Sequence, residues 1–525
     1  MPDKFMVSKE AVVLDGESLR LDEVVAVARD GRRALLSTRA KERMAESRRR
    51  VEEWASGTEL FYGINTGFGA NQNKAIAAGE IEHLQKNLIL SHAAGVGEPF
   101  PVETVRAMML LRANSLARGY SGIRIEVVEK LLELLNKGVT PVVPCKGSVG
   151  SSGDLAPLAH MTLVMLDLPG HDCGEAFFDE QRMTGALAMQ RAGVEPVKLL
   201  AKEGLALTNG TQAITATGAL ALFDALNLCK VADICGSLTL EALKGKGSPF
   251  LEEPHELRPF QGQKDCARNV RALTEGSELK DCVDEDTAGQ YQDAYSLRCM
   301  PQVHGASREA IAFVRRMIEI EINSVTDNPL IFPNHAKPLS AGNFHGQPVA
   351  LSMDFLKLAV AELGNISERR VAYLTDEKRN RGLPAFLAQN AGVNSGLMMT
   401  QYTAAALASE NKVLIHPASG DSIPTSANQE DHNSMGTIAA RQAREVVDNV
   451  EQILAIEWLC SAQALEWRKQ KPGVGTSAAY QLIRRHVPPL DEDRVLYPDI
   501  ERARSLIHSG ELVNAMEEAN SITVL

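Results

Sequence analysis

One long stretch without helix-breaking residues constrains the fold of this chain more than any other feature. Residues 437–471 contain neither glycine nor proline. Their apolar side chains recur at steps of three and four, at Ala443, Val446, Val447, Val450, Ile453 and Leu454. That spacing predicts a long amphipathic helix with one buried face. The Ala-, Leu- and Thr-rich residues 207–243 predict a second helix that is buried on most sides. We expect further helices over 309–322 and from about Pro348 to Val371, with a loop at 323–329 between them.

The N-terminal part of the chain is more broken than the rest. Glycine and proline cluster at 63–69, 95–101, 141–153 and 168–174, which is typical of loops. We therefore predict a mainly α fold with a loop-rich N-terminal domain (1–206), a central bundle of long helices (207–480) and a C-terminal helical segment (481–525). Long apolar helix faces commonly pack between subunits, which favours a symmetric oligomer.

Composition narrows the class of partner. The 525 residues carry 55 basic and 67 acidic side chains, a formal charge of −12, which disfavours binding to nucleic acid. The longest apolar stretch, 155–166, is too short to cross a bilayer, and residues 1–10 lack the apolar core of a secretory signal. Eight cysteines without a C-x-x-C pair indicate reduced cytoplasmic thiols rather than disulfides or zinc, and no H-E-x-x-H metal motif is found. Small molecules are the favoured partners.

The first segment that indicates a catalytic function is Gly147-Ser-Val-Gly-Ser-Ser-Gly-Asp154. A phosphate-binding loop would end in Gly-Lys-Ser/Thr, and this segment ends in Gly-Asp. A plain tight turn is one remaining interpretation. The other is autocatalytic cyclisation, in which the nitrogen of Gly153 attacks the carbonyl carbon of Ser151, two waters leave, and Ser152 supplies an exocyclic methylidene. Glycine is required at the attacking position because a side chain would obstruct the compressed backbone, and Asp154 is placed to assist proton transfer.

This segment resembles the aromatic amino-acid ammonia-lyase family. There an Ala-Ser-Gly triplet, usually within Gly-Ser-Val-Gly-Ala-Ser-Gly-Asp-Leu-Ala-Pro-Leu, forms 4-methylideneimidazole-5-one (MIO). Ser151 stands where the family has alanine, and since its side chain lies outside the ring, we expect MIO to form from Ser151, Ser152 and Gly153 without an external cofactor. The resemblance extends from about Tyr62 to Trp467. It implies a fumarase/aspartase-like helical fold and a homotetramer whose active sites are shared between subunits.

The resemblance also assigns two groups around the ring. Electrons gained by MIO settle on its carbonyl oxygen, so a hydrogen-bond donor should face that oxygen. Asn209, in Leu207-Thr-Asn-Gly-Thr-Gln212, is implied to be this donor, although an isolated Asn-Gly-Thr would more often cap a helix. Tyr62, in Phe61-Tyr-Gly-Ile-Asn-Thr-Gly-Phe-Gly69, is implied to be the β-proton base. A phenol needs a lowered pKa for that task, and from the residues alone Tyr62 is more readily a packed loop aromatic than a base.

Substrate binding is assigned by the same route. In Gln292-Asp-Ala-Tyr-Ser-Leu-Arg298, one helical turn would place Tyr295 and Arg298 on the same face. Arginine suits a carboxylate because it can donate two parallel hydrogen bonds. The resemblance makes Arg298 the anchor for the substrate carboxylate, with Tyr295 and Gln292 near the reacting centre. Without the resemblance, Arg298 would be taken for a surface residue.

Substrate choice depends on the groups facing the substrate ring. Leu90-Ser-His92 resembles the Ser-His pair of histidine ammonia-lyases, and Glu410, in Ala408-Ser-Glu-Asn-Lys412, is matched to a glutamate that contacts the imidazole. A phenyl ring would leave such groups unpaired at a cost of roughly 1–3 kcal/mol each. Phe344 falls where the family places an aromatic near MIO, and Gln212 and Thr425–His432 are also typical of histidine enzymes.

We therefore expect conversion of L-histidine to trans-urocanate and ammonia. A Ser-His pair also occurs in some tyrosine aminomutases, so a tyrosine or phenylalanine ammonia-lyase and an aromatic 2,3-aminomutase remain alternatives. A non-catalytic helical assembly is the alternative from another class of protein.

Overall fold

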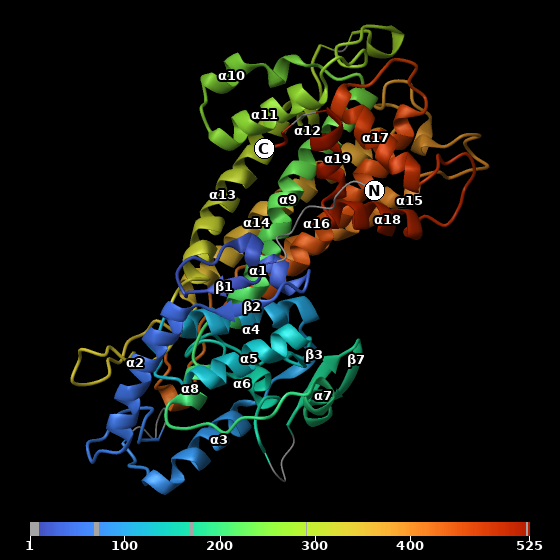
Figure 1. Cartoon of the computed structure of the whole chain (residues 1–525). Coiled ribbons are helices and arrows are strands. Elements are labelled where there is room, and N and C mark those ends of the chain that lie inside the picture. The colour runs from blue at the N-terminus through green and yellow to red at the C-terminus, as the bar shows by residue number, and fades with distance from the viewer. Residues whose placement is uncertain (1–9, 68–72, 169–172, 290, 521–522) are drawn as a thin grey trace. The chain divides into compact units, whose positions relative to one another are not determined.

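The computed structural model describes residues 10–67, 73–168, 173–289, 291–520 and 523–525. Residues 1–9, Phe68 and Gly69, about which the sequence made predictions, lie outside these ranges, as does part of the cluster at 168–174. Helices dominate the described chain, and its strands form small sheets (Figure 1), so the expected mainly α fold is confirmed. The described residues group into two compact units, neither of which is continuous in sequence.

Unit 1 comprises Met1–Phe223, Arg315–Asp354 and Pro417–Arg441. Its helices are α1 (Leu21–Ala28), α2 (Thr38–Ala55), α3 (Ile81–His92), α4 (Val102–Ala117), α5 (Ile125–Lys137), α6 (Leu155–Leu163), α7 (Gly185–Ala192) and α8 (Glu203–Thr208). Strand β1 (Val12–Leu14) pairs in parallel with β2 (Ala34–Leu36), and β3 (Val96–Pro99) pairs antiparallel with β5 (Pro144–Lys146). A third, antiparallel sheet joins β4 (Thr140–Pro141), β6 (Glu175–Phe178) and β7 (Gln181–Thr184) in that order.

Unit 2 comprises Asp224–Val314, Phe355–His416 and Gln442–Leu525. Its shorter helices are α10 (Glu252–Glu256), α11 (Gln261–Leu273), α12 (Tyr295–Arg298), α15 (Met398–Leu414), α17 (Val474–His486), α18 (Tyr497–His508) and α19 (Glu511–Asn520). Four long helices contribute residues to both units: α9 (Gln212–Ala242), α13 (Met300–Glu321), α14 (Gln347–Thr375) and α16 (Gly436–Leu465). The three consecutive domains expected from the sequence stay a prediction.

The long helices confirm the periodicity of the sequence, with shifted ends. All six residues of the predicted apolar face of α16 are fully buried, and burying each large aliphatic side chain contributes about 1.5–3 kcal/mol. The helix ends at Leu465 rather than at residue 471, because Glu466, Trp467 and Arg468 donate their backbone N–H groups to carbonyls three residues back. That tighter spacing closes the helix.

The second predicted helix is divided in two. Helix α8 ends at Thr208, and Asn209 follows with an extended backbone (φ −92°, ψ 98°) before α9 begins at Gln212. At this break, Gly210 forms a parallel β-bridge with Gly153. The predicted loop at 323–329 is confirmed, and Pro348 occupies the first turn of α14, where its missing N–H costs no hydrogen bond. None of the described helices is long and apolar enough to span a membrane.

Candidate active site

The segment 147–154 is a largely buried turn that leads from β5 into α6. Gly153 has φ +77°, and a Cβ added there would lie 2.1 Å from the carbonyl oxygen of Gly210. The neighbouring Asp154 donates its backbone N–H to that same oxygen over 2.6 Å. Position 153 therefore accepts only glycine, because both the left-handed backbone and the approach of Gly210 exclude a side chain.

Asp154 holds this turn in place. Its buried carboxylate accepts hydrogen bonds from the hydroxyls of Ser148 and Thr437, both over 2.7 Å, and from the N–H of Ile214 over 2.8 Å. These donors tie the turn to the first turns of α9 and α16. Burial raises the pKa of Asp154, and the hydrogen bonds oppose that shift only in part.

Asn209 faces the middle of the serine–glycine triplet. Its Nδ2 donates to the carbonyl oxygen of Ser152 over 2.7 Å. The buried guanidinium of Arg112 fixes the backbone behind it by donating to the Asn209 carbonyl oxygen (3.0 Å) and to Oε1 of Gln212 (2.8 Å). Burial lowers the pKa of Arg112 to about 10, although the charge of Asp327 opposes the shift. An amide held in this way is a preorganised donor for negative charge on the Ser152 oxygen.

A carboxylate lies over both serines of the triplet. Oε2 of Glu430 accepts the hydroxyls of Ser151 (2.8 Å) and Thr425 (2.7 Å), and Oε1 accepts the hydroxyl of Ser152 (2.8 Å). Burial favours the neutral acid, but the hydrogen bonds from these three hydroxyls hold the pKa of Glu430 below its usual range. Glu430 is therefore ionised at neutral pH.

The segment that carries Glu430 is a strained hairpin. Thr425 and Glu430 exchange backbone hydrogen bonds of 2.9 and 3.3 Å. Between them Ser426, Ala427 and Asn428 all have positive φ, between 51° and 66°. A left-handed backbone costs about 1–2 kcal/mol at each residue that is not glycine. Such strain persists only where surrounding contacts demand it and is concentrated at functional sites.

Three further predicted residues belong to the same unit. His92 ends α3 and is half-buried, with the Ser91 hydroxyl 3.0 Å from its Nδ1. Burial lowers the pKa of His92, opposed by a hydrogen bond at the Leu88 backbone and by the charge of Glu430, so the ring is neutral at pH 7 and offers one donor and one acceptor. Tyr62 lies half-buried in the turn after Phe61, and Phe344 lies half-buried ahead of α14.

The remaining predicted residues belong to unit 2. Gln292 and Tyr295 are exposed, and the guanidinium of Arg298 lies 4.9 Å from the centre of the Tyr295 ring. The predicted common face of Tyr295 and Arg298 on one helical turn, α12, is confirmed. Glu410 is exposed on α15, and its proposed contact with substrate stays a prediction.

Glu430 is the site residue that the sequence analysis missed. The sequence analysis assigned only Glu410 as a carboxylate near the substrate, which stays a prediction, and it did not single out Glu430, the acid that contacts Ser151 and Ser152. It lies inside the segment Thr425–His432, which the sequence analysis noted as a motif without assigning a role to its glutamate. The available signal was an acid a few residues before the start of a long helix, which is too common a pattern to single out one residue.

A second cluster of titratable groups lies in unit 2. The ligand atoms of Asp233, Cys266 and His304 all lie within 4.8 Å of one another, and the three side chains are buried. Arg308 donates to Asp233 over 2.6 Å, and Nδ1 of His304 lies 2.6 Å from the same carboxylate. Burial opposes ionisation of Asp233, but Arg308 and His304 hold its pKa below the usual range. This cluster is a charge-neutralised core network rather than an open site.

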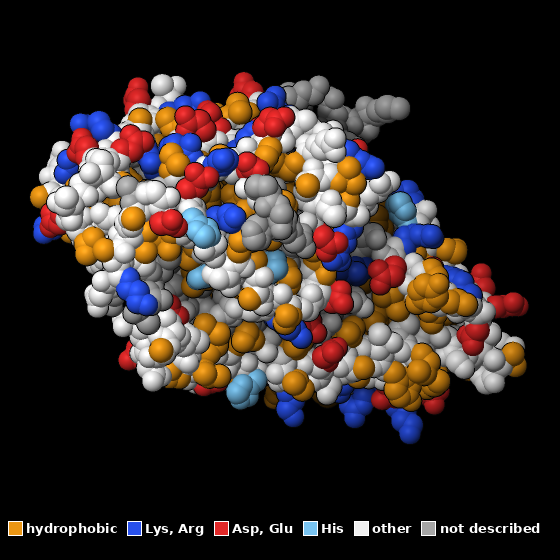
Figure 2. Space-filling model, turned by 90° about the horizontal axis from the view of Figure 1, so that it is seen from below, with side chains coloured by type: hydrophobic (Ala, Val, Ile, Leu, Met, Phe, Trp, Pro, Cys, Tyr) orange, Lys and Arg blue, Asp and Glu red, His pale blue; other side chains and the backbone are white. Residues whose placement is uncertain are grey.

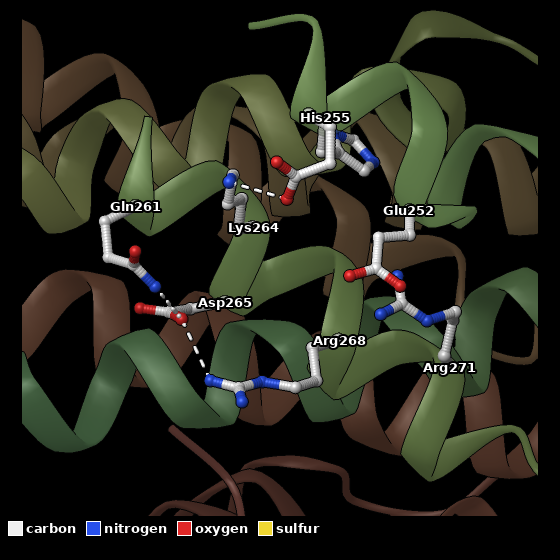
Figure 3. Close-up of a pocket in the computed structure, with 8 residues that line it drawn as sticks. Glu252, His255, Gln261, Lys264, Asp265, Arg268 and Arg271 are labelled. Atoms are coloured by element: carbon white, nitrogen blue, oxygen red, sulfur yellow. Dashed lines mark hydrogen bonds and ion pairs between the residues drawn. The ribbon is translucent and has the colours of Figure 1, made fainter. Parts of the chain in front are cut away.

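A shallow polar hollow of about 160 Å³ lies between α10 and α11 (Figure 3). Four of its charged side chains form two ion pairs: Lys264 binds Glu256 over 2.6 Å, and Asp265 binds Arg268 over 3.3 Å. None of the residues predicted for catalysis lines it. On the face of the molecule in Figure 2, acidic and basic side chains are interspersed, without a continuous basic surface on that face.

The fold and the buried serine–glycine turn define a class of enzyme, and comparison with known proteins identifies it. The aromatic amino acid lyase family matches residues 19–485, and the chain belongs to this family. It is 53% identical over 508 residues to a histidine ammonia-lyase of Caldanaerobacter subterraneus subsp. tengcongensis, covering 97% of this chain and 98% of that protein.

Solved structures agree on the fold. A histidine ammonia-lyase from Trypanosoma cruzi matches with a TM-score of 0.89 and 42% identity, over 97% of this chain and 96% of that one. A tyrosine aminomutase from Streptomyces globisporus matches with a TM-score of 0.92 and 37% identity, over 98% and 100% of the two chains.

Proposed function

We propose that this chain is a histidine ammonia-lyase that converts L-histidine to trans-urocanate and ammonia. The observation that carries the proposal is the buried turn at Ser151–Gly153, with Asn209 on its central carbonyl and Glu430 on both serine hydroxyls. The histidine ammonia-lyases similar to this chain over nearly its whole length support the choice of substrate.

The residues of the turn fit the MIO group. Position 153 accepts only glycine, as the attacking nitrogen requires, and Ser152 is half-buried rather than enclosed in the core. The Ser152 carbonyl, which ring formation retains, already accepts the Asn209 amide. We infer that Ser151, Ser152 and Gly153 form MIO without an external cofactor. MIO supplies the electrophile that activates the substrate for loss of its amine.

Side-chain chemistry suits two groups of the site to an imidazole substrate. A neutral His92 and an ionised Glu430 offer the donor and acceptors that an imidazole ring needs, and a phenyl ring would leave them unpaired at roughly 1–3 kcal/mol each. We assign Arg298 to the substrate carboxylate and Tyr62 to removal of the β-proton, with Tyr295, Gln292 and Phe344 beside the reacting centre. These last roles stem from the family resemblance.

We also propose a cytoplasmic homotetramer with shared active sites. Phe313 on α13 and Phe355 on α14 are 37% and 46% exposed, and their rings contact each other with centroids 5.9 Å apart. Exposed aromatic pairs on long helices are typical of surfaces that pack against another subunit. Eight scattered cysteines suit a reducing compartment.

The test is to incubate the purified protein separately with histidine, tyrosine and phenylalanine and to follow the ultraviolet absorbance of the conjugated acid formed. We expect rapid product from histidine. Rapid product from tyrosine and none from histidine would refute the substrate.

The likeness to a tyrosine aminomutase supports a second candidate, migration of the amine to Cβ. Chromatographic analysis of the same reactions for a β-amino acid separates migration from elimination.

A further inference from the structure

The hydroxyl of Ser152 must leave as water for the methylidene to form, and hydroxide is a poor leaving group. Its oxygen therefore needs a proton from a neighbouring acid. Oε1 of Glu430 lies 2.8 Å from this Oγ. Asp154 was the sequence-based candidate for proton transfer. Its carboxylate oxygens instead accept hydrogen bonds from the hydroxyls of Ser148 and Thr437 and from the backbone N–H of Ile214.

From this geometry we propose that Glu430 is the catalytic acid–base of the dehydration of Ser152, and that Asp154 is a positioning residue for the turn. The inference rests on the proposed function, because it concerns the maturation of the MIO group. It assigns Glu430 a task that precedes any encounter with substrate.

The step conserves atoms and charge. The Cα–H bond of Ser152 breaks and its electron pair becomes the second bond of the Cα–Cβ double bond. The Cβ–Oγ bond breaks and its electron pair stays on oxygen. The carboxylate of Glu430 takes the proton from Cα and delivers it to Oγ, so one water leaves and Glu430 returns to its ionised form. No oxidant, reductant or metal is consumed.

The surroundings of Glu430 suit both halves of this step. The carboxylate is ionised at neutral pH and can act first as a base. Its other oxygen, Oε2, is held by Ser151 and Thr425, so that it keeps its orientation after the Ser152 hydroxyl is lost. Ser151 stands where the family has alanine, and this gives its hydroxyl a role: it holds Glu430 in place by a hydrogen bond from within the triplet.

The test is intact-mass spectrometry of the full-length protein at successive times after synthesis. Formation of the ring removes two waters, about 36 Da. The wild type should reach this mass, whereas Glu430→Gln should keep the Ser152 hydroxyl and lose no more than one water, about 18 Da. The matched control is Glu321→Gln, because Glu321 also accepts a threonine hydroxyl in unit 1, that of Thr211. This control should mature like the wild type.

A second variant guards against misfolding. Glu430→Ala leaves space beside Ser152, and added formate should restore the loss of about 36 Da if a carboxylate is the missing catalyst. Maturation of Glu430→Gln at the wild-type rate, or Glu430→Ala that folds but stays unmodified in formate, would overturn the proposal. Mature wild-type protein that fails to convert histidine would refute the substrate and leave this inference intact. Wild-type protein without the mass loss would refute both.

Discussion

Removal of the Asn209 amide tests the proposed electron sink directly. Substitution Asn209→Ala deletes the donor that lies 2.7 Å from the Ser152 carbonyl oxygen. It keeps the backbone in place, because Arg112 binds the carbonyl oxygen of residue 209 and not its side chain. The variant therefore changes one hydrogen bond at the reacting centre and leaves the break between α8 and α9 intact.

The magnitude follows from where the charge develops. A buried donor aimed at an oxygen that gains negative charge is worth about 2.7–4 kcal/mol in the transition state, or a factor of about 10² to 10³ in kcat. In the ground state the same deletion leaves the carbonyl of Ser152 unpaired and costs about 1–3 kcal/mol of stability. We therefore expect kcat for histidine to fall by about two to three orders of magnitude, with a smaller change in KM.

Two measurements make the result interpretable. Intact mass shows whether the variant still loses about 36 Da, and only mature protein is used for kinetics. Asn136→Ala is the matched control, because Asn136 also bonds backbone groups through its amide, at Ala34, and belongs to unit 1. It should lose stability without losing turnover. Mature Asn209→Ala within threefold of the wild-type kcat would refute the reasoning.

Three further outcomes are expected. Gly153→Ala forces a left-handed alanine against Gly210 and should lower the free energy of unfolding by about 2–5 kcal/mol in denaturant melts and abolish the mass loss; normal mass and stability would contradict this. Ser151→Ala removes one donor from Glu430, whose pKa is held below its usual range. Because the ionised form exists above that pKa and is lost as pH falls through it, the acid limb of kcat/KM should move to higher pH, and an unmoved limb would contradict the role of Ser151. Co-expression of Ser152→Ala with Arg298→Ala should restore part of the activity that each lacks alone if subunits share sites, and fully inactive mixed tetramers would argue against sharing.

Periodicity made much of the fold predictable. The apolar face of α16 was identified from its three- and four-residue steps, because burial of that stripe is what stabilises a long helix. The ends of the helices were predicted less accurately. Arg468, just beyond the end of α16, donates to the carbonyl oxygen of Ala242, and nothing in the sequence indicates this contact. The break at Asn209 and Gly210 is a tertiary effect, since Gly210 pairs with Gly153.

The candidate site was predictable in its chemistry and not in its full geometry. Gly153 could be singled out because a compressed turn excludes a side chain, and its positive φ bears out that argument. Glu430 could not be, because its carboxylate reaches the serines only through a hairpin with three left-handed residues. Local propensity disfavours that backbone at Ser426 and Ala427, so no pattern in the sequence indicates it.

The contacts of the turn indicate whether the proposed cyclisation comes before or after folding. Asp154 accepts the Thr437 hydroxyl across a sequence separation of 283 residues, and the Gly150 carbonyl oxygen accepts the Ser434 hydroxyl across 284 residues. Glu430 meets Ser152 across 278 residues, and Asn209 meets it across 57. Bringing together residues so far apart in sequence costs conformational entropy, and only the formation of the surrounding core offsets that cost. The cyclisation proposed for the triplet must therefore follow the folding of unit 1, since only the folded unit brings Asp154, Asn209 and Glu430 to their partners.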